Sequence, residues 1–217
     1  MKKPEIKKEN ISVLHDGKYL KLFDLEFEPG KHYLDASRRG IEQLAVSKTD
    51  EEFKKMIPDA VSCIVILRVK GKAPRLFLNQ EFRYPTGRFL LSVPAGLIDP
   101  GDATDGNPVF NAAKREVFEE TGLRVEEGDR MSLVNPLLFS SPGMTDESNA
   151  LVQIVLERDE MPGFSQDGAE GCECFNGFSL LTKADAMELL KSGVDQDGIF
   201  YSVYTWAALM CFVSDIW

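Results

Sequence analysis

The sequence is poor in the residues that usually build a zinc site, a disulfide framework or a membrane anchor. Its 217 residues include only four cysteines, two histidines and two tryptophans. The nearest candidate for a membrane span, residues 207–213, is far shorter than a bilayer requires. With 43% hydrophobic and 28% charged residues, the composition is that of an ordinary soluble globular protein, long enough for one large or two small domains.

The cysteines give no sign of a metal or redox role. Cys172 and Cys174 are separated by a single residue, which is not the spacing of a zinc knuckle, and no second pair or nearby histidine follows. We therefore expect all four cysteines to be reduced thiols of a cytoplasmic protein. The lysines at the N-terminus precede no apolar run, so we expect no signal peptide.

Positive charge is also scarce. Lysine and arginine total 25 against 35 aspartates and glutamates, which gives a net charge of −10. This balance argues against non-specific binding to nucleic acid or to anionic membranes. An anionic nucleotide is still compatible with the chain, because a local basic pocket and a metal ion can overcome the overall charge.

The helix that we expect to begin at Pro108 has two distinct faces. Asn107 can cap its start, and Gly122 is a natural stop. An apolar arc of this helix can face a core and comprises Phe110, Ala113 and Val117. At 3.6 residues per turn, a second arc opposite it carries one guanidinium and three carboxylates: Arg115, Glu116, Glu119 and Glu120.

The three carboxylates should repel one another. Like charges three or four residues apart cost about 0.2–0.5 kcal/mol per pair, and Arg115 can relieve only Glu119, at i+4. A solvated acidic face would tolerate this repulsion. A hard divalent cation would resolve it, because Mg²⁺ binds through a few carboxylates and substrate phosphate oxygens. A strand end and turn over residues 94–102 favour the second interpretation.

Together, Gly96 and the nine residues 115–123 resemble the Nudix box. The chain departs from that pattern in two respects. Asp102 stands where the family has Glu, and twelve residues instead of seven separate it from Arg115. The extra residues fall in a turn-like run, 104–108, which should leave the helix carboxylates in place. The insertion puts a structural role for Asp102 in doubt.

Three further stretches resemble the ADP-ribose or ADP-sugar pyrophosphatase branch of that family: residues 80–85, 94–99 and 141–147. The resemblance runs from about Tyr33 to Leu181. Together with the strand and helix signals, it implies an α/β (α+β) fold, an α/β/α sandwich with a mixed sheet, and the strand signals place a small β-rich segment before it. We expect residues 1–50 to form that segment and residues 51–217 to form the Nudix hydrolase domain.

Patterns of alternation and helix capping predict the remaining elements. We expect a hairpin over residues 11–27, a further strand within 33–46 and a short capped helix over 49–56. The other predicted strands are 59–69, 74–82, 89–93, 131–139, 150–157 and 175–180. Two helices are predicted near the C-terminus, an amphipathic one over 183–191 and an aromatic-rich one over 199–217.

The resemblance implies hydrolysis of the diphosphate bond of a nucleotide sugar, most simply ADP-ribose to AMP and ribose 5-phosphate, with Mg²⁺ or Mn²⁺ as cofactor. The implied metal ligands are Glu116, Glu119, Glu120 and the backbone carbonyl of Ala95. Arg115 would orient them as an ion-pair partner. The general base would come from the loop 167–173, in which Glu173 aligns best and Glu170 second. Both acids could instead be solvated loop residues.

The resemblance also implies substrate contacts on both sides of the box. Arg83 would hold the diphosphate as a bidentate guanidinium, and the loop at Ser141, together with Leu97, would contact the rest of the substrate. Tyr33 and Arg38 would hold the adenine side, often across a dimer interface, so we expect a homodimer. Without the resemblance these are a surface arginine, a turn and ordinary strand residues.

Two other functions remain open at this point. The first is hydrolysis of another nucleotide sugar or of a dinucleoside compound by the same fold. The second, of a different class, is a sensor domain that binds a nucleotide sugar without cleaving it. A sensor would be expected to lose box carboxylates and to carry a DNA-binding extension, whereas this chain keeps Glu116, Glu119 and Glu120.

Overall fold

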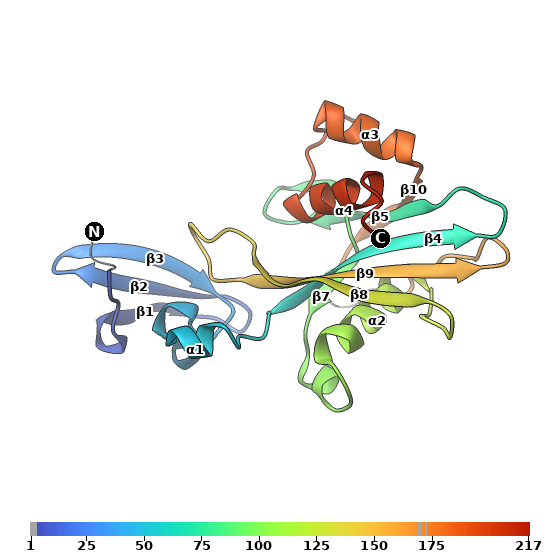
Figure 1. Cartoon of the computed structure of the whole chain (residues 1–217). Helices are drawn as coiled ribbons and strands as arrows, with labels where there is room; N and C mark the ends of the chain where they lie inside the picture. The colour runs from blue at the N-terminus through green and yellow to red at the C-terminus, as the bar shows by residue number, and fades with distance from the viewer. Residues whose placement is uncertain (1–3, 169–170, 172) are drawn as a thin grey trace. The chain divides into compact units, whose positions relative to one another are not determined.

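The computed structural model describes residues 4–168, 171 and 173–217, which form two compact units (Figure 1). The first unit comprises the chain up to Asp59 together with Leu137–Asn149. The second comprises Ala60–Pro136 and Ala150–Trp217. The boundary expected at residue 50 therefore differs from the division in the structure, which also assigns residues 137–149 to the first unit.

The first unit is built on a three-stranded antiparallel sheet in the order β1-β2-β3. Its inner face packs Phe23 and Leu25 against Leu44, and all three are buried. Its strands are β1 (Ile11–Asp16), β2 (Lys21–Glu28) and β3 (Lys31–Ser37). Its helical turns are η1 (Lys8–Asn10), η2 (Ile41–Gln43), η3 (Ala45–Ser47) and α1 (Asp50–Phe53).

Two local predictions for the first unit can be compared with the structure. The short helix α1 begins with the expected capping box, in which the Thr49 side chain and the Glu52 side chain each bond the other residue's backbone N–H. The strand expected within residues 33–46 ends at Ser37. The Ser37 hydroxyl accepts a hydrogen bond from the Arg39 N–H at 3.0 Å, which turns the backbone out of the strand.

A seven-stranded sheet organises the second unit, in the order β10-β5-β4-β9-β8, with β6 paired to β5 and β7 paired to β4. The β4 strand runs parallel to β9, since Asp59 N–H donates to Ser148 O and Lys70 N–H donates to Arg158 O. The sheet is therefore mixed, as predicted. Its strands are β4 (Ala60–Val69), β5 (Arg75–Arg83), β6 (Arg88–Ser92), β7 (Ala95–Leu97), β8 (Arg130–Phe139), β9 (Ser148–Arg158) and β10 (Phe175–Leu181).

Helices cover both faces of this sheet (Figure 1). On one face, Val61, Cys63 and Val65 of β4 pack with Ala113 and Val117 of α2 (Pro108–Thr121). The other face carries α3 (Lys183–Ser192) and α4 (Val203–Val213). The predicted α/β/α sandwich is confirmed for this unit. Alternate residues of β4 reach opposite layers because strand side chains alternate.

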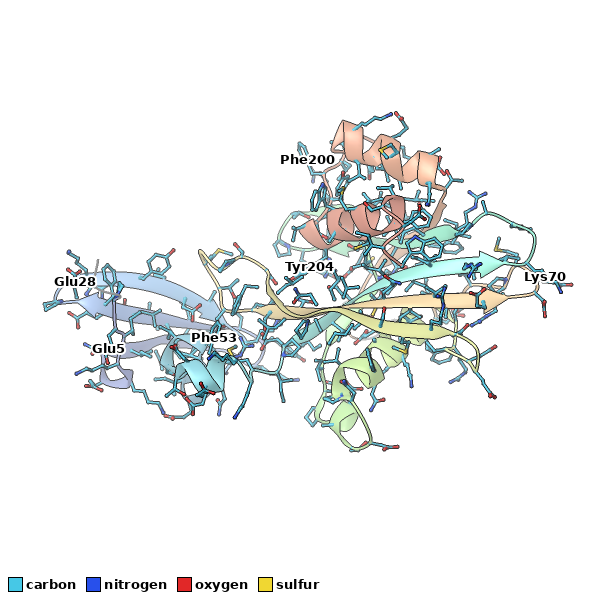
Figure 2. The ribbon with its side chains drawn as sticks, viewed as in Figure 1. Glu5, Glu28, Phe53, Lys70, Phe200 and Tyr204 are labelled. Atoms are coloured by element: carbon cyan, nitrogen blue, oxygen red, sulfur yellow. The ribbon has the colours of Figure 1, made fainter. Side chains whose placement is uncertain are left out.

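Local signals set the helix ends in the second unit. The Asn107 side chain accepts from Val109 N–H at 3.0 Å at the start of α2, and Gly122 ends that helix in the left-handed region at φ 74°. The C-terminal helix is shorter than the predicted 199–217. Ser202 caps α4, and Phe200 lies before it with 75% of its surface exposed (Figure 2). None of the helices in the described residues has the length and apolar character to span a membrane.

Three cysteines are described, and all are free thiols. Cys63 is buried beneath α2, Cys174 is exposed, and Cys211 is half-buried. Cys172, the fourth, lies outside the described residues. Burial raises the pKa of the Cys63 thiol well above its usual value, so this group is neutral.

Candidate active site

Two of the helix carboxylates are buried rather than solvated. Glu116 and Glu120 are 4% and 2% exposed and continue the row that begins with the buried Ala112. The prediction that Glu116 and Glu120 lie opposite the apolar arc was wrong. They lie beside that arc because the row at i, i+4 from Ala112 also faces the protein interior, toward β5 and β7.

The Glu120 carboxylate is held by neutral donors. Its Oε1 accepts from the backbone N–H of Ala95 at 2.9 Å, and its Oε2 accepts from Nδ2 of Asn79. Among the described residues, no Lys or Arg forms an ion pair with it. Burial raises the pKa of Glu120 well above its usual value, and the charges of Glu81 and Glu116 add to the rise.

Glu116 lies directly against the backbone of β7. A Cβ atom on Gly96 would collide with the Glu116 carboxylate, so the glycine permits the close approach of strand and side chain. Gly96 pairs with Val61 within the sheet and is not in the predicted turn. Burial raises the pKa of Glu116 to about 7, and Glu119 contributes to this rise, against the lowering effect of Arg115.

Arg115 relieves more than the single carboxylate predicted for it. Its NH1 lies 2.7 Å from Glu116 Oε1 and 3.1 Å from Glu119 Oε2. Its NH2 donates to the backbone oxygen of Leu97 at 2.9 Å and lies 3.0 Å from Asp102 Oδ2. The guanidinium therefore links the helix to β7 and to the loop that precedes the helix.

Asp102 has a structural role despite the insertion that put it in doubt. It is 7% exposed and lies in η4 (Pro100–Ala103), where its Oδ2 accepts from Asp99 N–H at 2.8 Å as well as from Arg115. The side chain of Asn111 donates to the Asp102 carbonyl at 3.0 Å. These bonds tie the residue before the inserted loop to α2, and residues 103–107 of the loop are exposed.

Sequence reasoning missed a fourth glutamate, Glu81 on β5. It is 9% exposed, its Oε2 lies 2.6 Å from NH2 of Arg83, and its side chain also bonds Ser92. Burial raises the pKa of Glu81, Arg83 lowers it, and Glu173 raises it further. The available signal was the polar pair Asn79 and Glu81, which alternation places on the same face of the strand as the buried Phe77.

Of the two candidate bases, only Glu173 can be placed. It is exposed, and its charge raises the pKa values of Glu81, Glu116 and Glu120, so it lies within electrostatic range of the cluster. Glu170 lies outside the described residues. The catalytic role of Glu173 stays a prediction.

The remaining predicted substrate residues belong to the first unit. The Tyr33 hydroxyl donates to the Gly143 carbonyl at 2.7 Å, and the Arg38 side chain pairs with Glu147. The Ser141 carbonyl accepts from the N–H groups of Met144 and Thr145 at 2.9 and 3.0 Å. The structure thus brings Tyr33 together with the loop that begins at Ser141.

A cavity of about 260 Å³ lies beside this loop. Phe53 and Phe139 stack in its wall with ring centroids 5.9 Å apart, and Phe53 is labelled in Figure 2. Tyr33, Asp35 and Met144 complete the part of the wall nearest the loop. Most of the lining residues are apolar, and Asp35 and Asp146 contribute carboxyl groups.

The chemistry of the helix cluster fits a hard divalent cation. Glu116 and Glu120 project from α2 toward β7, Glu119 pairs with Arg115, and burial and mutual repulsion raise the pKa values of Glu116 and Glu120. A bound cation would remove that penalty. Across residues 4–168, 171 and 173–217, no three acidic, histidine or cysteine side chains already form a metal-ligand geometry. Here Glu120 faces amide donors and Glu116 faces Arg115.

Comparisons with a family model and with curated proteins point to the same family. Residues 56–198 match the model of the NUDIX domain. Over 145 residues the chain is 37% identical to the putative nudix hydrolase 2 of Caenorhabditis elegans, covering 65% of this chain and 59% of that protein. Over 123 residues it is 31% identical to the ADP-ribose pyrophosphatase of Saccharomyces cerevisiae, covering 54% and 49%. The chain thus spans about half the length of these curated relatives.

The fold has a counterpart among solved structures. A crystal structure of an ADP compounds hydrolase superposes with a TM-score of 0.59, covering 100% of this chain and 95% of that one. The two sequences are 21% identical, so the similarity is one of fold.

Proposed function

The chain belongs to the Nudix family, and from this premise we propose that it is a metal-dependent hydrolase of nucleoside diphosphate-sugars. The substrate that we propose is ADP-ribose, cleaved at its diphosphate bond to AMP and ribose 5-phosphate. The name of the yeast relative, ADP-ribose pyrophosphatase, supports this substrate class. The match of the box residues supports the hydrolytic chemistry.

One observation carries the proposal: the buried carboxylates of α2 have too little positive charge around them. Arg115 contacts Glu116 and Glu119, while Glu120 has only amide donors among the described residues. Buried acids without a cation are costly for a fold. Such an arrangement is expected where a cation belongs to the working protein.

Nudix hydrolases generally use divalent metal ions, and we propose Mg²⁺ here, with Mn²⁺ as an alternative. The ligands would be Glu116, Glu119, Glu120 and the backbone carbonyl of Ala95. A divalent ion at such a site polarises phosphoryl oxygens and lowers the pKa of water. Arg115 would hold the helix carboxylates in place through its bonds to Leu97 and Asp102.

The other proposed roles belong to groups beside this cluster. Arg83 would hold the diphosphate, since a planar guanidinium binds two phosphate oxygens at once; Glu81 supports its position through the 2.6 Å ion pair. Glu173 would accept a proton from the attacking water, as a general base must lie within reach of it. Leu97 and Ser141 are further proposed substrate contacts.

The first unit would contribute the adenine side of the site in a homodimer. Tyr33 is 50% exposed, so its ring is free to stack on a base, an interaction worth about 1–3 kcal/mol. Arg38 is its proposed companion. Other exposed apolar side chains in this unit support association with a second copy: Val13, Leu14, Leu34 and Met144.

The test is a substrate panel with purified protein and Mg²⁺: ADP-ribose, ADP-glucose, GDP-mannose and a diadenosine compound. We expect AMP release to be fastest with ADP-ribose and to stop with a chelator. Faster hydrolysis of another compound would reassign the substrate. If the protein bound a nucleotide sugar and cleaved none of the panel, the sensor function would replace this proposal.

Light scattering of the intact chain tests the dimer separately. We expect the mass of two chains at micromolar concentration. In that state Tyr33→Ala should raise KM for ADP-ribose roughly tenfold, which corresponds to the lower range of stacking energies. A monomer with full activity would remove the shared-site proposal.

A further inference from the structure

We propose that Asn79 is a positioning residue that fixes the Glu120 carboxylate for metal binding, and that Gln166 sets the direction in which the Asn79 amide faces. The inference rests on the proposed function, because it takes Glu120 as a metal ligand. Both residues lie outside the Nudix box: Asn79 is on β5, and Gln166 is in the segment that follows β9.

The side chain of Asn79 is completely buried in the middle of β5. Its Nδ2 donates to Glu120 Oε2, and its Oδ1 accepts from Nε2 of Gln166 at 3.0 Å. A carboxamide has one donor end and one acceptor end. If it turned over, an oxygen would face the Glu120 carboxylate, so the orientation of this amide decides whether Glu120 is held or repelled.

Gln166 makes the required orientation the stable one. Its Nε2 offers a donor to Asn79 Oδ1 and also donates to the Gly177 carbonyl at 3.3 Å, which leaves the Asn79 donor end for Glu120. Gln166 is itself fixed by its neighbours. Ser165 N–H donates to Thr121 O at 3.0 Å, and a Cβ on Gly168 would lie 2.6 Å from the Glu119 carbonyl oxygen.

The segment 165–168 is therefore packed on the last turn of α2, the helix that carries the metal ligands. Bonds from two directions hold the two oxygens of Glu120: Ala95 N–H on β7 and Asn79 on β5. With both bonds, the carboxylate plane cannot rotate. With Ala95 alone it can turn about its last torsion, and a cation must then restrict that freedom on binding.

Outer partners of this kind typically change metal affinity by about 10–100-fold when they are removed. If Asn79 only satisfied a buried cavity wall, its loss would lower stability without a specific effect on metal affinity. The two possibilities therefore differ in an observable that does not depend on turnover.

The experiment measures Mn²⁺ binding to the intact protein by electron paramagnetic resonance of the free ion. We expect Asn79→Leu, which is nearly the same size, to weaken Mn²⁺ binding by about tenfold or more. Gln80→Leu is the matched control, since the next residue of a strand points to the opposite face, and it should bind Mn²⁺ as the wild type does.

Kinetics should show the same selectivity. In Asn79→Leu the Mg²⁺ concentration for half-maximal activity should rise about tenfold, KM for ADP-ribose should stay unchanged, and kcat should recover at high Mg²⁺. Because metal binding also stabilises a weakened fold, this comparison requires that the variant is folded in the absence of metal. Unchanged Mn²⁺ affinity in folded Asn79→Leu would overturn the proposal.

Gln166→Met keeps the test decisive if Asn79→Leu does not fold, because Gln166 is only partly buried. We expect the single variant to weaken Mn²⁺ binding a few-fold. Where Asn79→Leu does fold, Gln166→Met should add no further loss in that background, since it acts through Asn79. Wild-type Mn²⁺ affinity in Gln166→Met, or fully additive losses of Mn²⁺ affinity in the double variant, would refute the proposal that Gln166 acts through Asn79. Failure of the wild type to bind Mn²⁺ at all would instead refute the proposed function.

Discussion

The two units each bury a group of acids, and the partners of these acids differ between the units. In the first unit, Arg39 lies between Asp59 and Asp146, with N–O separations of 2.8 and 3.4 Å, and its side chain is only 9% exposed. Asp146 also accepts from the Ser37 hydroxyl at 2.6 Å and from Ala45 N–H at 2.9 Å. Every partner in this group comes from the same unit.

In the second unit, one arginine contacts only some of the buried acids. Arg115 is shared among carboxylates of α2 and of the preceding loop, with its side chain 30% exposed. Glu120 and Glu81 lie beyond its reach, and burial raises the pKa of both. The comparison teaches that burial of acids alone does not identify a site. What distinguishes the second group is that its most buried carboxylate, Glu120, is held by amide donors and by no ion pair among the described residues.

The largest expected effect is on Glu120. Glu120→Gln removes a charge that the protein does not neutralise, so the fold should be retained while kcat falls by about a thousandfold or more, as for loss of a central electrostatic group. Turnover of ADP-ribose at saturating Mg²⁺ and thermal unfolding measure the two parts. Glu127→Gln, an exposed acid beyond α2, is the control. Near wild-type turnover in Glu120→Gln would contradict the metal assignment.

In the first unit, replacing Arg39 should lower the stability of the fold, whereas replacing Glu120 should lower turnover. Arg39→Leu strands two buried carboxylates, which typically costs about 3–5 kcal/mol. Urea unfolding at pH 7 should show this loss. Arg38→Leu is the control, because that arginine is exposed and its ion pair with Glu147 is worth about 1 kcal/mol or less. Equal losses in the two variants would mean that the Arg39 cluster is not a structural one.

A pH effect is expected from Asp35, which lies in the same unit. Burial raises the pKa of Asp35 to about 6 from 3.8, with Asp146 adding to the rise. The folded state thus binds this proton more tightly than the unfolded state. Its contribution to stability is complete below about pH 4 and is lost as the pH rises through 6, by about 3 kcal/mol at most.

Asp35→Asn removes this dependence because the amide does not titrate. We expect the variant and the wild type to have similar free energies of unfolding at pH 4, and the variant to be the more stable at pH 7. Urea titrations at the two pH values measure the difference. A constant difference between the two proteins across this range would show that Asp35 keeps its ordinary pKa.

The smallest effect concerns the guanidinium beside the acidic cluster. Arg83→Lys keeps the charge and loses the planar fork, so kcat/KM for ADP-ribose should fall roughly tenfold, about 1.4 kcal/mol. Arg88→Lys, at the paired position of β6, is the matched control and should leave kcat/KM unchanged. Unchanged kinetics for Arg83→Lys would place the diphosphate elsewhere.

The elements that the sequence predicted well are those with strong local signals. Asn107 and Gly122 bound α2, as expected from capping, and α3 begins at Lys183, the residue predicted from its amphipathic pattern. The predicted strands correspond to β4, β5 and β6 within a few residues. The short strand β7 was missed because Gly96 resembles a turn residue when its pairing with β4 is unknown.

For the candidate site, the sequence predicted which residues share a helix face but not what that face contacts. The arc shared by Glu116, Glu119 and Glu120 follows from the helical repeat alone, so the sequence was sufficient to predict it. Whether that arc faced water or the interior depended on which strands lay beside α2. That is why the burial of Glu116 and Glu120 and the several partners of Arg115 were not foreseen.

By itself, the sequence determined a short list of properties: the helix, its acidic arc, the alternating strands and the membership of a family. Only the tertiary structure decided that Glu81, Asn79 and Gln166 join the helix carboxylates, and that Arg39 closes a separate acidic group. The physical reason is one of range. Capping and periodicity act within a few residues, whereas these contacts join segments up to 109 positions apart, which become neighbours only in the folded chain.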